Sequence, residues 1–434
     1  MNARDVARRV LARVDEGAYA TLALSGELGR ARNLTPSDRG LATELVYGVL
    51  KRRLRLDHAL AALAPRGLEA LDQRVLDALR IGAHQILFLR VPAHAAVDDA
   101  VGAVKQARGQ KLANFANALL RRLAREGEPP PPPLSDPVAH LSIVESAPSW
   151  LVRDALDRFG FDEAQRYLAA LNAPAPLWLR ANALRAGRDE AMRAVAADRP
   201  DATLAPSPVV PEAFRVEGAG DLSTLKPFAE GLVTAQDVAA QRVARLCDPQ
   251  PGERILDGCA GVGGKSTHLA ALAGDRARID SADLSARKLD LGDDLARRLG
   301  VTSMTRVVCD LTDPRAPLEA AYDRVLLDAP CSGLGVLRRH PEAKWRRQPE
   351  DAVALASLQA RMLDAVAPRV RSGGVLVYSV CTYTDAEGPA QLARFLAAHP
   401  DFAVDGEPLR TWPHRDDGDG FYAVRLLRAT NRIG

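Results

Sequence analysis

The chain has 434 residues, and at about 100–200 residues per domain we expect two to four domains. Hydrophobic residues make up 47% and charged residues 26%, with a net charge of +3, a balance that is typical of soluble globular proteins and excludes disordered, fibrous and membrane-spanning chains. No uncharged apolar run reaches the roughly 18–20 residues that cross a bilayer, and residues 1–16 lack the apolar core of a signal peptide, so we expect a cytoplasmic protein.

The first third of the chain predicts an all-helical bundle. Apolar residues recur at helical spacing through 1–126, and strand-like alternation is almost absent. Residues 1–128 contain 21 basic and 14 acidic side chains, and this surplus favours an anionic partner such as nucleic acid. Five consecutive prolines at 129–133 favour extended polyproline II, so we expect a linker over 129–137.

The rest of the chain predicts two further domains. Residues 138–227 mix helical and strand-like stretches, which indicates a small α+β module. From 228 to 434, short apolar runs alternate with helical stretches, a pattern typical of a parallel sheet covered by helices. The expected strands are 254–257, 279–283, 305–309, 324–328 and 374–379, with an added edge strand at 421–427.

The cysteines are few, odd in number and scattered: Cys247, Cys259, Cys309, Cys331 and Cys381. This argues against a disulfide framework, and the lack of CxxC and HxxxH pairs argues against a zinc site, so no metal is expected. A lone cysteine is most often a packed apolar residue. Cys331 and Cys381 are exceptions because each follows a predicted strand beside turn residues, which favours a reactive thiol.

A glycine-rich turn follows the first strand of the last domain, over residues 255–265 (ILDGCAGVGGK). Its spacing meets neither the dinucleotide pattern GxGxxG nor the phosphate loop GxxxxGK[ST]. Asp283 ends the next strand and could bind ribose hydroxyls, and Asp310 follows the third strand and could bind an adenine amine. A glycine loop followed by two acids in this order fits S-adenosylmethionine at least as well as a dinucleotide.

Two further motifs bear a family resemblance. Asp328-Ala329-Pro330-Cys331-Ser332-Gly333 follows one predicted strand, and Ser379-Val380-Cys381-Thr382 follows another. Together with 228–241, 338–345 and 419–421, they resemble the RsmB-type family of RNA 5-methylcytosine methyltransferases. The helical first third is similar to the NusB-type RNA-binding domain of that subfamily. One departure is that Gly261-Val262 replaces the family's Ala-Pro, so we expect a less preorganised loop.

The resemblance implies a fold and an activity. The fold would be a NusB-like bundle at 1–128, an α+β RNA-binding module at 138–227 and a Rossmann-like class I methyltransferase domain at 228–434. The reaction would move a methyl group from S-adenosylmethionine to carbon 5 of a cytosine in small-subunit (16S) ribosomal RNA. Cys381 would bond to carbon 6, Cys331 would assist release, and Asp328 would bind the pyrimidine edge.

The resemblance and the motifs also give binding residues. The expected cofactor-binding residues are Cys259, Ala260, Gly261, Val262, Gly263, Gly264, Lys265, Asp283, Asp310 and Asp328. The expected RNA-binding residues are Lys51, Arg52, Arg53, Arg338, Arg339, His340, Lys344 and Trp345. A monomer is the expected oligomeric state.

Several alternatives stay open at this level. An amino-group methyltransferase would carry an aromatic residue where Cys331 stands, and a nicotinamide dehydrogenase would leave the two cysteines unexplained. An inactive RNA-binding ribosome or transcription factor has support only from Gly261-Val262. A 5-methylcytosine methyltransferase acting on another RNA, such as tRNA, carries the same motifs.

Overall fold

The computed structural model describes residues 2–430 and separates into two compact units. The first, called here the helical unit, holds the chain up to Pro174 together with Leu337–Arg347. The second, the sheet unit, holds Ala175–Val336 and the chain from Gln348 onward. The boundaries of these units differ from those of the domains expected from the sequence, which stay a prediction. Over residues 2–430, no helix is long and apolar enough to cross a membrane.

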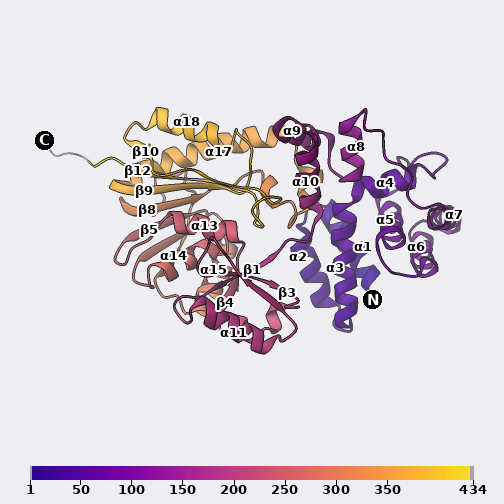
Figure 1. The fold of residues 1–434 in the computed structure, drawn as a ribbon, viewed down its shortest axis with the longest axis horizontal. Coiled ribbons are helices and arrows are strands. Elements are labelled where there is room, and N and C mark those ends of the chain that lie inside the picture. Colours follow the sequence, from indigo (N-terminus) through magenta and orange to yellow (C-terminus); the bar gives the residue numbers. More distant parts are fainter. Residues whose placement is uncertain (1, 431–434) are drawn as a thin grey trace. The chain divides into compact units, whose positions relative to one another are not determined.

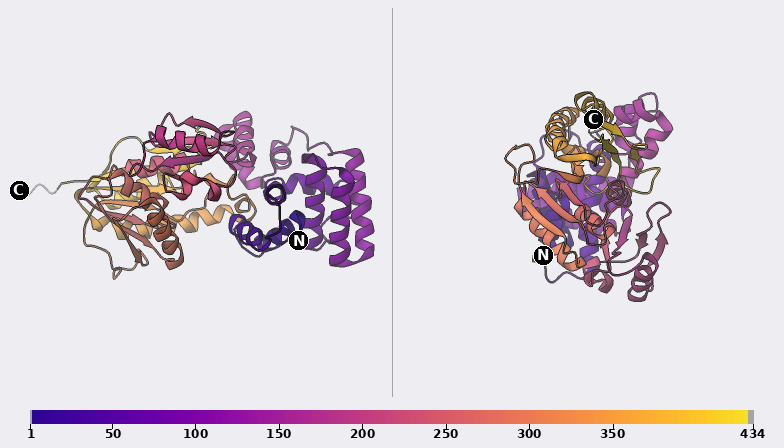
Figure 2. Two further views of the ribbon diagram at one scale, coloured as in Figure 1. Left: turned by 90° about the horizontal axis from the view of Figure 1, so that it is seen from below. Right: turned by 90° about the vertical axis from the view of Figure 1, so that its left-hand side faces the viewer.

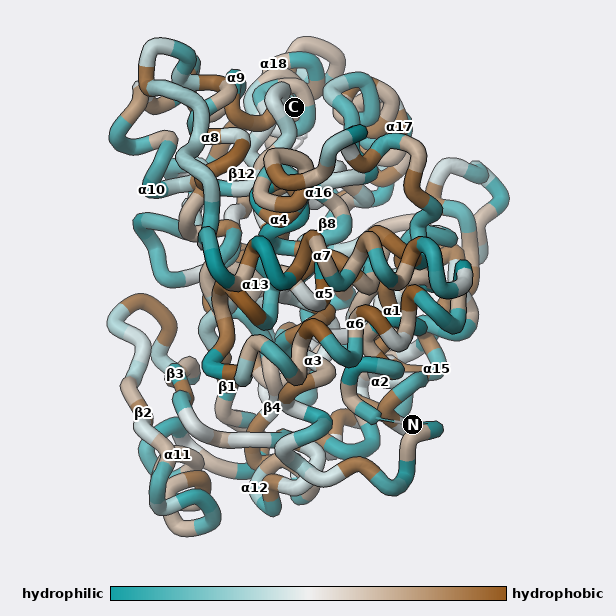
Figure 3. The backbone as a smooth tube through the Cα atoms, turned by 90° about the vertical axis from the view of Figure 1, so that its right-hand side faces the viewer, coloured by the Kyte–Doolittle hydropathy of each residue, from teal (hydrophilic) through white to brown (hydrophobic). Residues whose placement is uncertain are grey.

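The helical unit confirms the expected bundle, and residues 2–126 contain no strand. Local signals set its helix starts. Thr35 and Asp38 form a capping box around Pro36, and Asn2 and Asp5 form another at the first helix. Neighbouring helices α5, α6 and α7 run side by side (Figure 2), and along α3 and α7 apolar and polar residues alternate (Figure 3). The helices are α1 (Ala3–Asp15), α2 (Ala20–Arg30), α3 (Pro36–Lys51), α4 (Arg53–Ala61), α5 (Gln73–Phe88), α6 (Ala93–Arg108), α7 (Gln110–Glu126), α8 (Pro137–Val144), α9 (Ser149–Phe159), α10 (Phe161–Asn172) and α16 (Ala343–Arg346).

The smaller sheet of the sheet unit confirms an α+β module. Its four strands are antiparallel, in the order β2-β3-β1-β4. Leu179, Phe214 and Val233 form its core with Val195 of α11. The elements are β1 (Leu177–Ala181), α11 (Arg188–Asp198), β2 (Thr203–Pro206), β3 (Ala213–Glu217), α12 (Lys226–Ala229) and β4 (Val233–Ala235), with a 3₁₀ turn at Leu222–Thr224.

The larger sheet has eight strands and confirms the Rossmann-like prediction (Figure 1). Its order is β10-β12-β9-β8-β5-β6-β7, and β11 also pairs with β12. Strands β9, β8, β5, β6 and β7 are parallel, and β12 is antiparallel to β9. The elements are α13 (Val238–Leu246), β5 (Arg254–Gly258), α14 (Gly264–Leu272), β6 (Arg278–Asp283), α15 (Ala286–Leu299), β7 (Met304–Val308), β8 (Tyr322–Asp328), α17 (Pro349–Val366), β9 (Val370–Val380), α18 (Pro389–Ala398), β10 (Phe402–Val404), β11 (Leu409–Thr411) and β12 (Phe421–Arg428), with 3₁₀ turns at Leu334–Val336 and Ala367–Arg369.

The prediction of an edge strand at 421–427 was wrong. Strand β12 lies inside the sheet, because β10 and β11 pair with the side that faces away from β9. Burial along this strand is continuous from Phe421 to Val424, as in a strand covered on both faces, rather than alternating as in a strand with one exposed face. Two short strands with weak local patterns were therefore missed.

Alternating side chains of the parallel strands supply two cores. Leu256, Leu327 and Tyr378 pack with α17 and α18, whereas Ile255 and Leu326 pack with α13, α14 and α15. Figure 1 shows these two helix layers on opposite faces of the sheet. Because β5, β6, β8 and β9 are parallel, their carboxyl ends lie at the same end of the sheet, where an open α/β sheet binds ligands.

Candidate functional site

Two thiols meet at the edge of the parallel sheet. Cys331 follows β8 and Cys381 follows β9, and these neighbouring strands are in register at Asp328 and Ser379. The Sγ atoms lie 3.2 Å apart, and both cysteines are half-buried. Parallel strands that end together place the residues after them side by side, so the fold itself makes the thiol pair.

A half-buried ion pair lies next to the thiols. Lys265 Nζ donates to Asp328 Oδ2 at 2.6 Å, and Ser379 Oγ donates to Asp328 Oδ1 at 3.0 Å. Burial alone lowers the pKa of Lys265, but the charges of Asp328, Asp257 and Cys381 more than offset it, and the pKa lies above its ordinary value. The ammonium group is therefore a fixed positive charge at this site.

Acidic groups surround the thiol of Cys331. Its hydrogen bond with Cys381, its burial, and the charges of Cys381, Glu387 and Asp328 raise its pKa well above the ordinary thiol value. The raised pKa favours the protonated thiol at Cys331, whose Sγ shares a hydrogen bond with Cys381 Sγ.

The glycine loop between β5 and α14 is tightly folded. Gly261 has a φ of +57° and donates its N–H to Asp283 Oδ2 at 3.0 Å. A Cβ on Gly263, whose φ is +77°, would lie 3.1 Å from Gly292 Cα of α15. Cys259 adopts a φ of +63° without being a glycine, which is a strained conformation. The N–H of Gly261, the residue that replaces the family's Ala, is thus held by a carboxylate.

A pocket of about 270 Å³ lies beside this loop. Asp257 Oδ1 is buried in its wall and has no hydrogen-bond partner among the residues described, and burial raises the pKa of this carboxyl to about 7. An unpartnered acceptor among carboxylates fits the ammonium and sulfonium charges of S-adenosylmethionine. The lining residues are Gln236, Ala240, Asp257, Cys259, Ala260, Gly261, Val262, Gly264, Lys265 and Asp328.

Most of the expected cofactor-binding residues thus come together, and some do not. Gly263 packs closely against Gly292 of α15. Asp283 accepts hydrogen bonds from the N–H groups of Gly261 and of Ser285, which caps α15. Asp310 is exposed and binds its own turn through Thr312, outside the pocket wall. Sequence reasoning missed Gln236 and Asp257. The position of Asp257 at the end of a predicted strand, directly before the glycine turn, was a usable signal.

Two of the expected RNA-binding residues in the basic segment 338–347, Arg338 and Lys344, are buried. Lys344 is 1% exposed, and its ammonium donates to the carbonyls of Lys51 and Ser146 and to Asn172 Oδ1 at 2.8–3.1 Å. Trp345 Nε1 donates to a backbone carbonyl of α3, and Arg338 is also buried. The structure leaves Lys344 no free donor for a phosphate, so its contribution here is to packing.

The other expected RNA-binding residues are placed as follows. Lys51 is buried and donates to Ala173 O at 2.8 Å, and burial lowers its pKa to about 8. The Arg52 guanidinium lies 4.8 Å from the centre of the Phe88 ring, and Arg53 lies over Trp345. Arg52, Arg53, Arg339 and His340 are half-buried, and their contact with RNA stays a prediction.

Positive charge that the sequence did not single out lines a pocket of about 390 Å³ in the helical unit. Arg8, Arg9 and Arg74 lie around it together with Asp77. Asp77 is buried beside Arg80, and burial raises its pKa to about 6. Arg8 and Arg9 lie in α1 and Arg74 lies in α5, so only the fold brings all three together.

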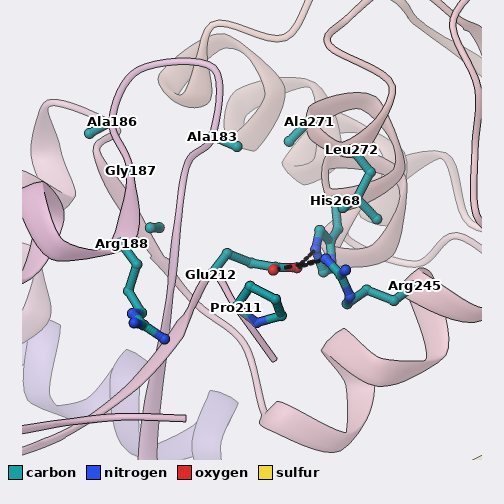
Figure 4. A pocket seen from close by; sticks show the side chains of 11 residues that line it. Ala183, Ala186, Gly187, Arg188, Pro211, Glu212, Arg245, His268, Ala271 and Leu272 are labelled. Carbon is teal, nitrogen blue, oxygen red and sulfur yellow. Dashed lines mark hydrogen bonds and ion pairs between the residues drawn. The ribbon is translucent and has the colours of Figure 1, made fainter. Parts of the chain in front are cut away.

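A second pocket of the sheet unit lies outside the expected site (Figure 4). Glu212 accepts hydrogen bonds from His268 Nε2 at 2.6 Å and from Arg245 at 3.0 Å. Burial lowers the pKa of His268 to about 4, and although burial raises that of Glu212, His268 and Arg245 bring it down to about 2. The imidazole is therefore neutral, and the ionised carboxylate of Glu212 pairs with Arg245.

The fold and the site define the class of protein. A parallel sheet of order β9-β8-β5-β6-β7, a glycine loop after its first strand and acidic residues around one pocket are those of an S-adenosylmethionine-dependent methyltransferase. Among residues 2–430, no group of three or more His, Cys, Asp or Glu side chains could hold a metal ion.

Comparisons with known proteins give the family. The model of the 16S rRNA methyltransferase RsmB/F family matches residues 244–427, that of the NusB family matches 1–125, and that of the RsmF/B-like ferredoxin-like domain matches 147–223. The chain belongs to the RsmB/F methyltransferase family. It is 35% identical to a probable ribosomal RNA small subunit methyltransferase B of Bacillus subtilis, covering 93% of this chain and 90% of that one. It is 36% identical to one of Synechocystis, covering 98% and 97%.

Solved structures agree with the fold. The crystal structure of PH0851 covers 98% of this chain and 99% of its own, with a TM-score of 0.84 and 24% identity. NSun6 from Pyrococcus horikoshii, solved with SFG, covers 66% of this chain and 100% of its own, with a TM-score of 0.59 and 21% identity.

Proposed function

We propose that this protein methylates carbon 5 of a cytosine in small-subunit ribosomal RNA through a transient covalent bond between Cys381 and carbon 6 of the base. The observation that carries the proposal is the 3.2 Å approach of Cys331 and Cys381 beside the cofactor pocket. The names of the relatives, which are ribosomal RNA small subunit methyltransferases, support the choice of RNA. The match of residues 1–125 to the NusB family and the basic first third support an RNA partner.

The chemistry requires a thiolate. Carbon 5 of cytosine is a weak nucleophile, and addition of a thiolate to carbon 6 makes it enamine-like, so that it can displace a methyl group. Bound S-adenosylmethionine supplies that electrophilic methyl group. Lys265 supplies a positive charge near the thiol pair, which a thiolate requires, and Asp328 would bind the pyrimidine edge. Loss of the proton from carbon 5 then breaks the bond between carbon 6 and sulfur and restores the ring.

Cys331 would act at the release step. The pKa of Cys331 is raised by its hydrogen bond with Cys381, by its burial, and by the charges of Cys381, Glu387 and Asp328. When Cys381 Sγ bonds to carbon 6, the hydrogen bond and the charge of Cys381 are lost, and the pKa of Cys331 falls. Cys331 can then lose its proton to water and accept the proton of carbon 5. The target cytosine must leave its stack for both sulfurs to reach it.

Two variants test the assignment with radiolabelled S-adenosylmethionine and small-subunit ribosomal RNA. For Cys331→Ala we expect a denaturation-resistant protein–RNA adduct, because attack proceeds and release fails. For Cys381→Ala we expect neither adduct nor methylated RNA. Cys309→Ala, which removes a thiol away from the pair, is the control and should behave like the wild type. The opposite behaviour of the first two variants would show that the roles are reversed, and a tRNA substrate run in parallel identifies the RNA class.

A further inference from the structure

We infer that Glu387 is a positioning residue that holds the loop carrying Cys331 in the geometry required for release of the methylated RNA. The inference rests on the proposed function, because it assigns Cys331 to the release step. Glu387 lies between Cys381 and α18, carries no recognisable motif, and was not among the residues expected from the sequence.

The carboxyl group of Glu387 is fully buried and accepts four hydrogen bonds. Oε1 accepts from Ser332 N at 2.8 Å and from Gln359 Nε2 at 3.0 Å. Oε2 accepts from Ser332 Oγ at 2.6 Å and from Thr384 Oγ1 at 2.9 Å. Every one of these partners donates, so both oxygens act as acceptors, as a carboxylate requires. A buried carboxylate held only by neutral donors is costly, which indicates a purpose beyond packing.

These bonds fix the backbone on both sides of Cys331. Ser332, the next residue, is held through its N–H and its hydroxyl. Pro330, the preceding residue, is held through its carbonyl, which accepts from Gln359 Nε2 at 2.9 Å. Gln359 itself contacts Glu387 and accepts from Tyr378. Hydrogen bonds thus hold the residues on both sides of Cys331. Glu387 takes part in both sets, directly at Ser332 and through Gln359 at Pro330.

These hydrogen bonds matter because the Cys331 thiol must be correctly placed both in the resting site and at the release step. It lies 3.2 Å from Cys381 Sγ in the resting site, and for release it must lie within reach of carbon 5 of a cytosine bonded to that same sulfur. A Cys331 loop free to turn its thiol away would still permit attack by Cys381, since Cys381 directly follows β9 and Lys265 lies in α14. Loss of Glu387 should therefore slow release and spare attack.

Glu387→Ala and Glu387→Gln separate this role from general stability. A glutamine can keep the geometry, because its oxygen can accept the two N–H groups at the Oε1 position while its amide donates to the two hydroxyls, which can reverse. Alanine removes all four bonds. Ser332→Ala removes one hydroxyl only and serves if Glu387→Ala does not fold. The matched control is Gln391→Ala, a buried side chain of α18 that donates to Ala356 O and is not bonded to the Cys331 loop.

The assay is single-turnover methylation of small-subunit ribosomal RNA with radiolabelled S-adenosylmethionine, in which the covalent adduct and the released methylated RNA are counted separately. We expect Glu387→Ala to slow release by about 100-fold, the effect of a misplaced group, while adduct forms at the wild-type rate. Glu387→Gln should restore most of the release, Ser332→Ala should slow it less than Glu387→Ala, and Gln391→Ala should leave the adduct fraction unchanged.

Three results would overturn the inference. If Glu387→Ala slows attack and release equally, Glu387 has a structural role only. If Glu387→Ala releases methylated RNA at the wild-type rate, Glu387 has no role in release. Accumulation of adduct in both Glu387→Ala and Glu387→Gln would assign the effect to charge rather than to positioning. The Cys331→Ala variant distinguishes these results from failure of the proposed function: if it too forms no adduct, the covalent mechanism fails, whereas adduct in Cys331→Ala without adduct in Glu387→Ala refutes only the positioning role.

Discussion

Gly335→Ala tests the contact that closes the loop after Cys331. A Cβ at position 335 would lie 1.9 Å from Gly420 O and 2.9 Å from Gly420 Cα. Non-bonded heavy atoms are comfortable at about 3.5 Å, so the Gly420 carbonyl must move by about 1.5 Å. This displacement breaks the bond from Gly420 N–H to Gly335 O (2.8 Å) and disturbs the bond from Gly335 N–H to Cys381 O (3.0 Å).

The magnitude follows from these two backbone bonds. A buried polar group left unpaired costs about 1–3 kcal/mol, so we expect the free energy of unfolding to fall by about 2–5 kcal/mol. For a unit of this size that corresponds to a decrease in Tm of roughly 5–15 °C. Because the second bond ties the Cys331 loop to the backbone of Cys381, methylation should fall by about 100-fold.

Thermal unfolding followed by circular dichroism, together with methylation of small-subunit ribosomal RNA, measures both effects. Gly102→Ala is the control, since a Cβ on this residue of α6 meets nothing within 4 Å. Alanine at an open helical position stabilises by about 0.5–1 kcal/mol, so the control should not lose stability. A Gly335→Ala protein with wild-type Tm and activity would refute the reasoning.

Two further predictions concern buried ionisable groups. Lys344→Ala leaves the carbonyls of Lys51 and Ser146 unpaired, so the free energy of unfolding measured by urea titration should fall by about 2–4 kcal/mol. The control, Lys111→Ala at an exposed position, should change it by less than about 0.5 kcal/mol. Equal stability of the two variants would contradict the packing role of Lys344. The pKa of His268 falls from 6.5 to about 4 on folding, so the unfolded chain binds the proton more tightly, and stability from this group is present above pH 6.5 and lost as the pH falls toward 4. We expect the Tm of His268→Gln to drop less than that of the wild type between pH 7.5 and pH 4.5, and an unchanged pH dependence would contradict the assignment of His268 as neutral.

The sequence predicted most of what depends on strand ends. Glycine residues after β5 and cysteines after β8 and β9 are visible because a short apolar run precedes each of them, and parallel strands bring such residues to one edge. The class of fold, the cofactor and the thiol pair could therefore be expected before the structure was known.

The sequence could not predict what depends on packing between distant segments. The basic run around Lys344 reads as a solvated surface, yet carbonyls of Lys51 and Ser146, far away in the chain, take up its ammonium group. The interior position of β12 depends on the pairing of β10 and β11, which have weak patterns. Glu387 gives no local signal, because its four donors come from three separate segments.

The release of tritium from small-subunit ribosomal RNA labelled at carbon 5 of cytosine tests the central claim most directly. Methylation at carbon 5 replaces the hydrogen at that atom, so we predict one tritium released for each methyl group transferred by the wild-type protein. Cys381→Ala should release none. Methyl transfer without tritium release would place the methyl group on another atom and contradict the mechanism.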